Sequence, residues 1–287
     1  MQRKVVLISG CASGIGFHTA TYLCDKNYKV YAGLLDLEQD AGKLKNATIN
    51  PQGLVPLKLD ISSREDIQAA IKRIIDQEGR IDILINNAAY GLFGPVDTCT
   101  MEEIEQQFRV NLFGTIELTH AIIPYFRKQS SGRIICISSL RAFKSSSVQG
   151  VYSATKSALE AIGASWASTL FPWNIHVTLV EPGATATSFP SNMVFGSFYQ
   201  NQDNPYLNLI ENSLAVVHAW NNDEHKAQSP REIAVLIDTL LTCEKPPLRI
   251  QTNVQTQEEV ERFSKDPTGD VWLIDEIDLV KEWSASK

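Results

Sequence analysis

The sequence of 287 residues lacks the features that mark several classes of protein. No apolar window approaches the roughly eighteen residues of a membrane-spanning helix, and the first apolar run is too short for a secretory signal. The five cysteines are odd in number and lack the spacing of a metal site or a disulfide framework. We therefore expect reduced thiols in a cytoplasmic compartment and no transmembrane segment.

Basic residues are also scarce. The chain has 26 Lys and Arg against 33 Asp and Glu, a net charge of −7, and a pI of about 5.3. Because nucleic-acid binding needs clustered cations, this composition predicts no nucleic-acid partner. Hydrophobic residues make up 44% of the chain, enough for one large α/β domain or two small ones. No Pro-, Gly- or Ser-rich linker divides the chain, which favours a single domain over residues 1–287.

Two catalytic signatures are missing as well. The stretch nearest to a G-x-S-x-G nucleophile motif, residues 163–167, lacks the last glycine. The five histidines are dispersed and form no H-E-x-x-H pair. We interpret them as surface or satisfied core residues, and the sequence predicts no metal site.

The other motifs of the chain gather around a Y-x-x-x-K pattern at Tyr152 and Lys156. In a helix these two side chains lie one turn apart on the same face. The pKa of an unperturbed phenol is about 10, and a nearby ammonium lowers it by favouring the phenolate. A tyrosine tuned in this way can exchange a proton with an alcohol or a carbonyl. Tyr22 and Lys26 have the same spacing and are interpreted as a helix face only.

Buried strands and amphipathic helices alternate through the first 183 residues. We expect strands at 4–9, 28–33, 54–59, 81–85, 133–138 and 175–180. We expect helices at 14–26, 63–77, 101–126 and 151–170. A helix at 230–242, a strand at 248–251 and an acidic amphipathic tail follow. Repeated βα units with apolar strands predict a doubly wound parallel sheet, a Rossmann fold of the α/β class.

Residues 184–229 interrupt this alternation. The segment combines Ser, Asn and Gln with apolar side chains that show no clear period: Phe189, Met193, Phe195, Phe198, Tyr199 and Tyr206. Because the segment follows the last core strand, we predict a substrate lid or loop inserted into the domain. The alternative is a surface excursion whose rings pack only against one another.

Three short motifs follow expected strands, and each has a bland alternative. Gly10, Gly14 and Gly16 form a glycine-rich turn between the first strand and the first helix, where a pyrophosphate can approach the helix N-terminus. Alone, the turn is also what a tight strand–helix connection needs. Residues 86–89, Asn-Asn-Ala-Ala, permit close approach of a ligand or simply form a turn, and residues 138–139 are two serines at the end of the fifth strand.

Together, these features resemble the classical short-chain dehydrogenase/reductase family. The glycine motif, the Asn-Asn-Ala segment, an Asn–Ser–Tyr–Lys tetrad and a Pro-Gly turn follow in the family's order and spacing over nearly the whole chain. The resemblance implies that Tyr152 is the catalytic acid/base and that Lys156 lowers its pKa. It implies that Ser139, rather than Ser138, binds the substrate oxygen. Asn111 would hold a water of the proton relay, although it also fits a satisfied polar core residue.

The resemblance also implies a binding site for NAD or NADP. The residues expected to bind the cofactor are Gly10, Ser13, Gly14, Ile15, Gly16, Asp36, Asp60, Asn87, Ala88, Tyr152, Lys156, Pro182, Gly183 and Thr187. One departure is Ala89, where the family usually has glycine, and we expect the added methyl to reshape the cofactor floor without abolishing binding.

The choice between NAD and NADP depends on the end of the second strand. The family's acid for NAD would stand at Leu34, and the arginine of its NADP-using relatives would stand at Leu35. Asp36 follows these two positions, and Ser13 replaces the basic residue that some NADP enzymes carry. A 2′-phosphate without a nearby cation would be poorly compensated, so the sequence leans slightly to NAD.

A narrower resemblance is to the branch that contains estradiol 17-beta-dehydrogenase type 1 and photoreceptor retinol dehydrogenase. Residues 5–11, 29–32 and 266–269 carry it. It implies hydride transfer to or from a hydrophobic alcohol or ketone, steroid- or retinoid-like, and a homodimer or homotetramer. The alternative from another class is a non-enzymatic dinucleotide-binding regulator on the same fold.

Overall fold

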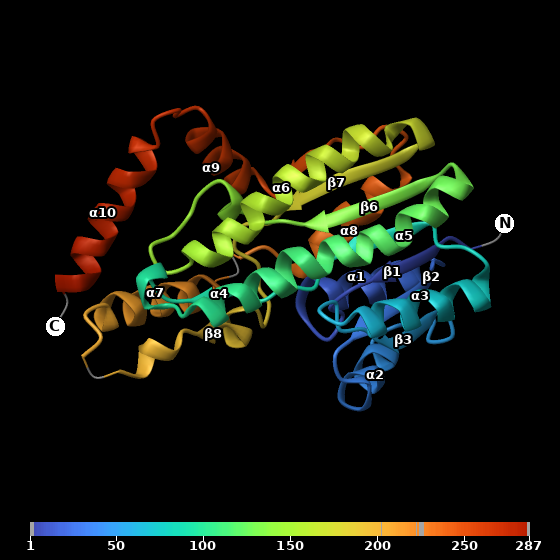
Figure 1. Ribbon diagram of the computed structural model, residues 1–287, viewed down its shortest axis with the longest axis horizontal. Coiled ribbons are helices and arrows are strands. Elements are labelled where there is room, and N and C mark those ends of the chain that lie inside the picture. The colour runs from blue at the N-terminus through green and yellow to red at the C-terminus, as the bar shows by residue number, and fades with distance from the viewer. Residues whose placement is uncertain (1–2, 202, 222, 224–226, 286–287) are drawn as a thin grey trace.

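A seven-stranded parallel sheet forms the centre of the protein, in the order β3-β2-β1-β4-β6-β7-β9 (Figure 1). The computed structural model describes residues 3–201, 203–221, 223 and 227–285. The strands are β1 Val5–Ile8, β2 Lys29–Leu34, β3 Leu54–Lys58, β4 Ile83–Asn86, β6 Gly132–Ile137, β7 Ile175–Glu181 and β9 Arg249–Gln251. The predicted doubly wound parallel sheet is confirmed.

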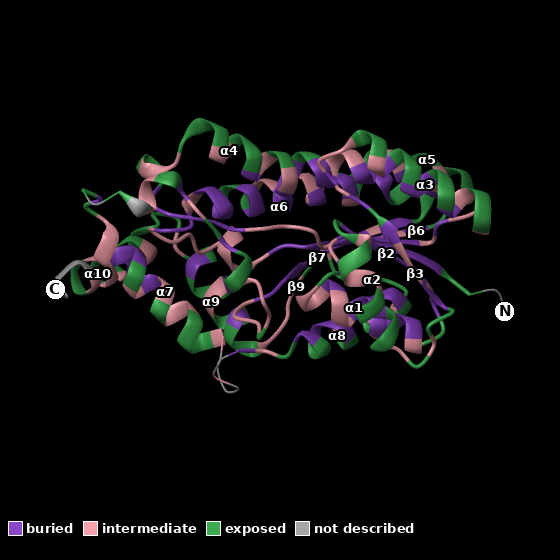
Figure 2. Ribbon diagram, turned by 90° about the horizontal axis from the view of Figure 1, so that it is seen from below, coloured by how far each residue is buried: buried purple, intermediate pink, exposed green. Residues whose placement is uncertain are grey.

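Helices cover both faces of this sheet, as Figure 2 shows. One face carries α1 Gly14–Asp25, α2 Leu37–Asn46 and α8 Pro230–Thr242, and the other carries α3 Arg64–Glu78, α5 Thr115–Gln129 and α6 Gly150–Leu170. Alternate residues of a strand enter opposite cores: Val5 and Leu7 pack toward α3, α5 and α6, and Val6 and Ile8 pack toward α1 and α8. Burial on both faces explains why the strands are almost entirely apolar.

The strand order reverses between β1 and β4. The chain passes from β1 outward to β2 and β3, then returns to the other side of β1 with β4 and continues through β6 and β7. In such sheets a crevice opens at the carboxyl ends of the strands where the order reverses. The glycine-rich turn follows β1 and the Asn86–Asn87 segment follows β4, so the fold brings these two motifs to that crevice.

The expected single helix over 101–126 is instead three segments. Helix α4, Met101–Phe108, begins at a capping box formed by Thr100 and Glu103. A π-helical turn, Arg109–Gly114, follows it, and α5 continues past Pro124 to Gln129. Gly114 allows this turn to approach Ile61, because a Cβ there would lie well inside van der Waals contact with the Ile61 carbonyl oxygen. The prediction of one continuous helix was therefore wrong at Asn111.

The segment 184–229 contains more regular structure than its composition predicted. Strand β8, Val194–Phe195, pairs with β5, Leu92–Phe93, and α7 spans Leu207–Asn221. The acidic tail forms α9, Val254–Ser264, and α10, Asp270–Ala285. Helices α7 and α10 lie side by side at the left end of the molecule in Figure 1. No helix of the described ranges has an apolar stretch long enough to cross a bilayer.

Candidate active site

The turn after β1 has a backbone that only glycine adopts without strain. Gly10 has φ +71° and Gly14 has φ +57°, both in the left-handed region. A Cβ on Gly10 would lie 2.7 Å from the Cα of Ala88, and one on Gly16 would collide with the carbonyl oxygen of Gly10. The turn is therefore packed against the end of β4 with no room for a side chain.

This turn leaves the N-terminus of α1 available to an anion. Ser13 stands at the N-cap with an extended backbone, and within the described chain its side chain caps no amide of the first turn. The first-turn N–H groups, which include those of Ile15 and Gly16, carry the positive end of the helix dipole. This arrangement fits the pyrophosphate of a dinucleotide. The uncapped amides can donate to its oxygens, and the glycine turn without a Cβ lets it approach the backbone.

Asn87 fastens the glycine turn to β4. Its Nδ2 donates to the carbonyl oxygens of Ser9 at 3.0 Å and Gly10 at 2.8 Å. The Ser9 hydroxyl in turn accepts from the amides of Asn87 at 3.0 Å and Ala88 at 3.1 Å. The sequence predicted Asn87 as a cofactor neighbour, and the structure adds that it holds the turn. Ser9 was missed, although its place at the end of β1 was a signal.

The two acids predicted for the adenosine side also make local hydrogen bonds. Asp36 is exposed, and its Oδ1 accepts from the Gln39 amide at 2.9 Å, which caps α2. Asp60 Oδ1 accepts from the amide of Ser62 at 2.8 Å and from its hydroxyl at 2.6 Å. Both residues nevertheless stand at the carboxyl edge of the sheet, after β2 and β3.

A cation that sequence reasoning missed, on the last residue of β3, lies beside the end of β2. The Nζ of Lys58 donates to the carbonyl oxygen of Leu35 at 2.7 Å and lies 3.7 Å from a carboxylate oxygen of Asp66. Lys58 pairs with Leu34 across the parallel strands, and this register brings the ammonium to the position where the sequence offered no basic residue. Register between strands is not visible in a single sequence, which is why the cation was missed.

Tyr152 and Lys156 are both buried on α6, with 7% and 3% of their surfaces exposed. Burial raises the pKa of Tyr152 to about 12, and a hydrogen bond with Ser139 and the charge of Arg141 oppose this rise. Lys156 Nζ donates to the Ile137 carbonyl oxygen at 2.8 Å and lies 5.7 Å from the centre of the Tyr152 ring. Burial also lowers the pKa of Lys156 to about 8.

Ser139 follows β6 by two residues and lies beside this pair. Its Oγ accepts from the Arg141 amide at 3.1 Å and starts a short 3-10 turn. Ser138 is buried, and its hydroxyl has no hydrogen-bond partner within the described residues. Of the two serines, Ser139 is the one that lowers the pKa of Tyr152. Arg141 was missed, because nothing in the sequence indicated which way its side chain turns.

The loop after Ser139 is held by the C-terminal helices. Lys144 Nζ lies 2.9 Å from Glu259 Oε2 on α9. From α10, Glu276 Oε2 accepts from the Ser147 amide at 3.0 Å, and Trp272 Nε1 donates to the Ser145 carbonyl oxygen at 3.1 Å. The tail of the chain therefore contributes to the geometry of the site.

Asn111 is fully engaged with its protein neighbours. Its Oδ1 accepts from the Tyr90 amide at 3.1 Å. Its Nδ2 donates to the Tyr90 carbonyl oxygen at 2.9 Å and to the Thr155 hydroxyl at 3.2 Å. The side chain thus joins the π-helical turn, the loop after β4 and α6. This geometry matches the alternative that the sequence left open, a satisfied polar core residue, and it does not bear on a water-holding role.

The segment after β7 packs against the glycine turn and Tyr152. Gly183 lies so close to Thr256 of α9 that a Cβ there would clash with its hydroxyl. Thr187 lies over the glycine turn, 3.3 Å from where a Cβ of Gly14 would stand. The ring of Phe189 lies 5.6 Å from that of Tyr152. The segment therefore runs from β7 past the glycine turn, which Thr187 contacts, and then reaches Tyr152 at Phe189.

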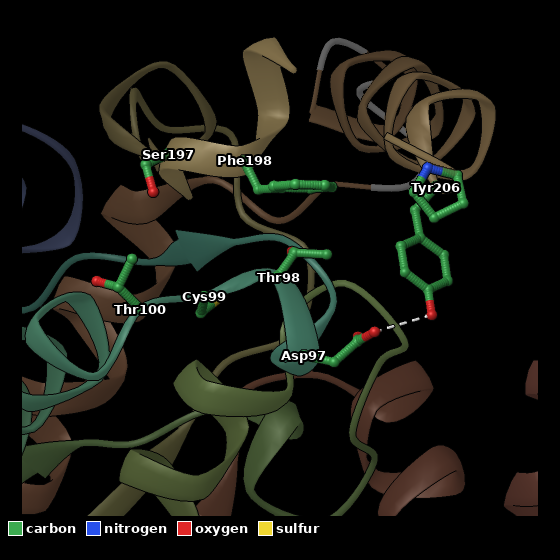
Figure 3. Close-up of a pocket in the computed structure, with 8 residues that line it drawn as sticks. Asp97, Thr98, Cys99, Thr100, Ser197, Phe198 and Tyr206 are labelled. Atoms are coloured by element: carbon green, nitrogen blue, oxygen red, sulfur yellow. Dashed lines mark hydrogen bonds between the residues drawn. The ribbon is translucent and has the colours of Figure 1, made fainter. Parts of the chain in front are cut away.

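A second concave region lies between the segments 97–100 and 197–206 (Figure 3). It is an open cavity of about 380 Å³, and the Tyr206 hydroxyl donates to Asp97 Oδ2 at 3.0 Å on its wall. Its lining residues are Asp97, Thr98, Cys99, Thr100, Ser197, Phe198, Pro205 and Tyr206. None of the residues predicted for the tetrad or the glycine turn belongs to this lining.

Comparison with known proteins agrees with this geometry. Residues 4–194 match the family model described as short chain dehydrogenase. The chain is 31% identical to 3-ketodihydrosphingosine reductase of Bacteroides thetaiotaomicron, over 90% of each chain. It is 33% identical to 17-beta-hydroxysteroid dehydrogenase type 1 of Homo sapiens, over 94% of this chain and 83% of that protein. It is 30% identical to retinol dehydrogenase 8 of Bos taurus, over 98% and 91%.

Solved structures share the same fold. A short-chain dehydrogenase from Streptomyces avermitilis has a TM-score of 0.81 at 26% identity, over 100% of both chains. A short chain dehydrogenase/reductase from Burkholderia phymatum, solved in complex with NAD, has a TM-score of 0.78 at 19% identity, over 93% of this chain and 97% of that one. The chain belongs to the short-chain dehydrogenase family and is an NAD(P)-dependent oxidoreductase.

Proposed function

We propose that the protein transfers hydride between a nicotinamide cofactor and a hydrophobic alcohol or ketone, with Tyr152 as the general acid/base. The observation that carries this proposal is a buried phenol whose pKa Ser139 and Arg141 lower against the effect of burial, and whose ring centre lies 5.6 Å from that of Phe189. Relatives at about 30% identity are named for sphingoid, steroid and retinoid substrates. We infer a substrate of that class, a long or polycyclic apolar molecule with one reacting oxygen.

The protonation state of Tyr152 suits it to act as an acid. Because burial raises the pKa of its phenol to about 12, the hydroxyl is protonated at neutral pH and can donate to a forming alkoxide. In the oxidation direction it must first release its proton, which the positive charge of Arg141 favours. We propose that the Lys156 ammonium, 5.7 Å from the centre of the ring, also favours this release. The cofactor, when bound, supplies or accepts the hydride. Ser139 binds the substrate oxygen, because its hydroxyl lies beside the phenol.

The segment 184–229 is proposed as the substrate lid. Phe93, Met193, Leu209 and Ile210 pack with Val148 into a third apolar cluster outside the two cores that flank the sheet. Phe189, Phe195 and Tyr199 lie against this cluster and are partly exposed. Phe189, which packs against this cluster and contacts the Tyr152 ring, would exclude water from the reacting carbon and favour an apolar substrate.

We propose NAD as the preferred cofactor. The exposed carboxylate of Asp36 stands at the end of β2, where it would repel a 2′-phosphate. Lys58 is the nearby cation, and the Leu35 carbonyl oxygen and Asp66 engage its ammonium. Release of Lys58 from these partners would reverse the preference, so both cofactors belong in the first assay.

We also propose a homodimer or homotetramer. Phe113, on the turn before α5, is 48% exposed, and Phe171, after α6, is 67% exposed. Exposed aromatic rings beside these two long helices support an interface there. Light scattering after size exclusion would give the mass directly, and a monomer would contradict this proposal.

The test is a panel of apolar alcohols and ketones assayed with NAD(H) and NADP(H) separately. Replacement Tyr152→Phe should reduce turnover by at least about a thousandfold, because it removes the acid/base while retaining the ring. Cofactor binding, measured by NADH fluorescence, should change little. Unchanged turnover would contradict the role of Tyr152. Fluorescence changes without turnover across the whole panel would favour the dinucleotide-binding regulator instead.

A further inference from the structure

A cluster of buried charges lies next to Lys156, and the proposed reaction does not use it. Glu160 stands one turn beyond Lys156 on the buried face of α6, with 8% of its side chain exposed. Glu181, the last residue of β7, is fully buried. Arg249 on the edge strand β9 reaches both acids: its Nε lies 2.7 Å from Glu160 Oε2 and 3.8 Å from Glu181 Oε1. Gln251 donates to Glu181 Oε2 at 2.5 Å.

The cluster holds two acids for one guanidinium. The Oε1 atoms of Glu160 and Glu181 are both buried and, within the described residues, neither has a hydrogen-bond donor. Two bare buried carboxylate oxygens are costly, and one proton held between two carboxyls satisfies both. In agreement, burial raises the pKa of Glu181 to about 7, and a hydrogen bond with Glu160 contributes to the rise.

Few groups around Lys156 carry charge. Burial raises the pKa of the Cys136 thiol on β6 to about 12, so that thiol is neutral. Tyr152, one turn before Lys156, is a neutral phenol for the same reason. The carboxylate of Glu160 is the charged group on α6 that opposes the effect of burial on Lys156. A buried ammonium therefore depends on a negative charge at one neighbouring position.

We propose that Glu160 is a positioning residue for Lys156: the Glu160–Glu181 pair shares one proton, and its remaining negative charge keeps Lys156 an ammonium. The proposal rests on the proposed function, in which Lys156 acts beside Tyr152 as a cation. It also assigns a role to Arg249, which balances the pair and holds its charge on the Glu160 side through the shorter of its two contacts.

The two acids should differ in the sign of their effect. In Glu160→Gln the charge can reside only on Glu181, and Lys156 loses the partner one turn away. In Glu181→Gln the charge can reside only on Glu160, and the ammonium keeps its partner. A merely structural role for the cluster would make the two variants equivalent. Glu160→Asp, which keeps the charge, serves as the rescue.

The experiment measures the pKa of Lys156 by competitive labelling with acetic anhydride, read peptide by peptide in the mass spectrometer. Glu160→Gln should lower the pKa of Lys156 by about one unit, because a neighbouring opposite charge is lost. Glu181→Gln should leave it unchanged or raise it. Glu160→Asp should restore at least half of the shift. The matched control is Glu117→Gln on α5, which removes an acid paired with Arg64 away from the cluster and should leave the Lys156 curve unchanged.

An unchanged pKa of Lys156 in Glu160→Gln would overturn the proposal, as would a fall of equal size in Glu181→Gln. If Glu160→Gln does not fold, the variants Glu181→Gln and Glu160→Asp decide. A fall in the pKa of Lys156 in Glu181→Gln overturns the proposal. An unchanged or raised pKa in Glu181→Gln, together with a retained pKa in Glu160→Asp, supports it. The labelling needs no substrate. An inert protein with the expected shifts would therefore contradict the proposed function and leave this inference intact.

Discussion

Two features of the turn after β1 require glycine at position 10: a left-handed backbone and the lack of room for a Cβ. Replacement Gly10→Ala tests both. Gly10 has φ +71°, and a Cβ there would lie 2.7 Å from the Ala88 Cα. The left-handed backbone costs a residue with a Cβ roughly 1–2 kcal/mol. Real Cβ contacts lie beyond 3.0 Å, so the turn must move by at least 0.3 Å (3.0 − 2.7) against backbone, at a further cost of about 1–3 kcal/mol.

The chain offers a matched control for the first of these two costs. Gly79 also has φ +71°, but nothing lies within 4 Å of the Cβ it would carry. Gly79→Ala should therefore lose only the roughly 1–2 kcal/mol of backbone strain. Gly42→Ala, in an exposed part of α2 with open space around it, should gain about 0.5–1 kcal/mol from helix propensity.

The assays are the free energy of unfolding from urea titration and the dissociation constant of NADH from fluorescence. We expect Gly10→Ala to lose about 2–5 kcal/mol of stability, the sum of both costs. Without cofactor, the turn of the variant can move away from Ala88. Binding of NADH requires the original conformation of the turn, so the affinity for NADH should fall at least about tenfold. A Gly10→Ala protein no less stable than Gly79→Ala, with unchanged NADH affinity, would refute the close-packing argument.

Three further outcomes follow from the site. Arg141→Met should shift the rise of kcat/KM for alcohol oxidation to higher pH by on the order of one unit, because Arg141 lowers the pKa of Tyr152; a pH profile that does not move would contradict this. Lys58→Met should weaken NADPH binding about tenfold and leave NADH binding within twofold, since Lys58 is the cation at the end of β2; fluorescence titration with both cofactors measures the ratio. Phe189→Ala should lower kcat/KM for an apolar ketone about tenfold, as an aromatic contact beside Tyr152 is lost, and equal losses with a small polar ketone would argue against a lid.

The strands and the sheet could be predicted because they depend on local patterns. Both faces of the sheet are buried, so each strand is an apolar run that ends at a polar or glycine residue. The start of α3 also has a local cause, because the Ser63 side chain caps the helix by accepting from the Asp66 amide. The order of βα units then predicted the doubly wound fold.

The parts that were missed depend on contacts between distant residues. Lys58 reaches Leu35 through strand register, and the π-helical turn at Asn111 is fixed by hydrogen bonds to Tyr90 and Thr155. The segment 184–229 contains a helix, α7, whose apolar residues face α10 and the third cluster. The helical period of these apolar residues was not recognised in the sequence, because the elements that they pack against lie far away along the chain. The pairing of Glu160 with Arg249 joins residues that are 89 positions apart.

The contacts between the C-terminal helices and the loop after Ser139 predict that activity depends on α9 and α10. A protein cleaved after Gln251 would retain every strand of the main sheet. It would lose the ion pair of Lys144 and the hydrogen bonds at Ser145 and Ser147. Limited proteolysis of the tail should therefore inactivate the enzyme before it unfolds the sheet, and a truncated form would still bind the cofactor while it turns over substrate poorly.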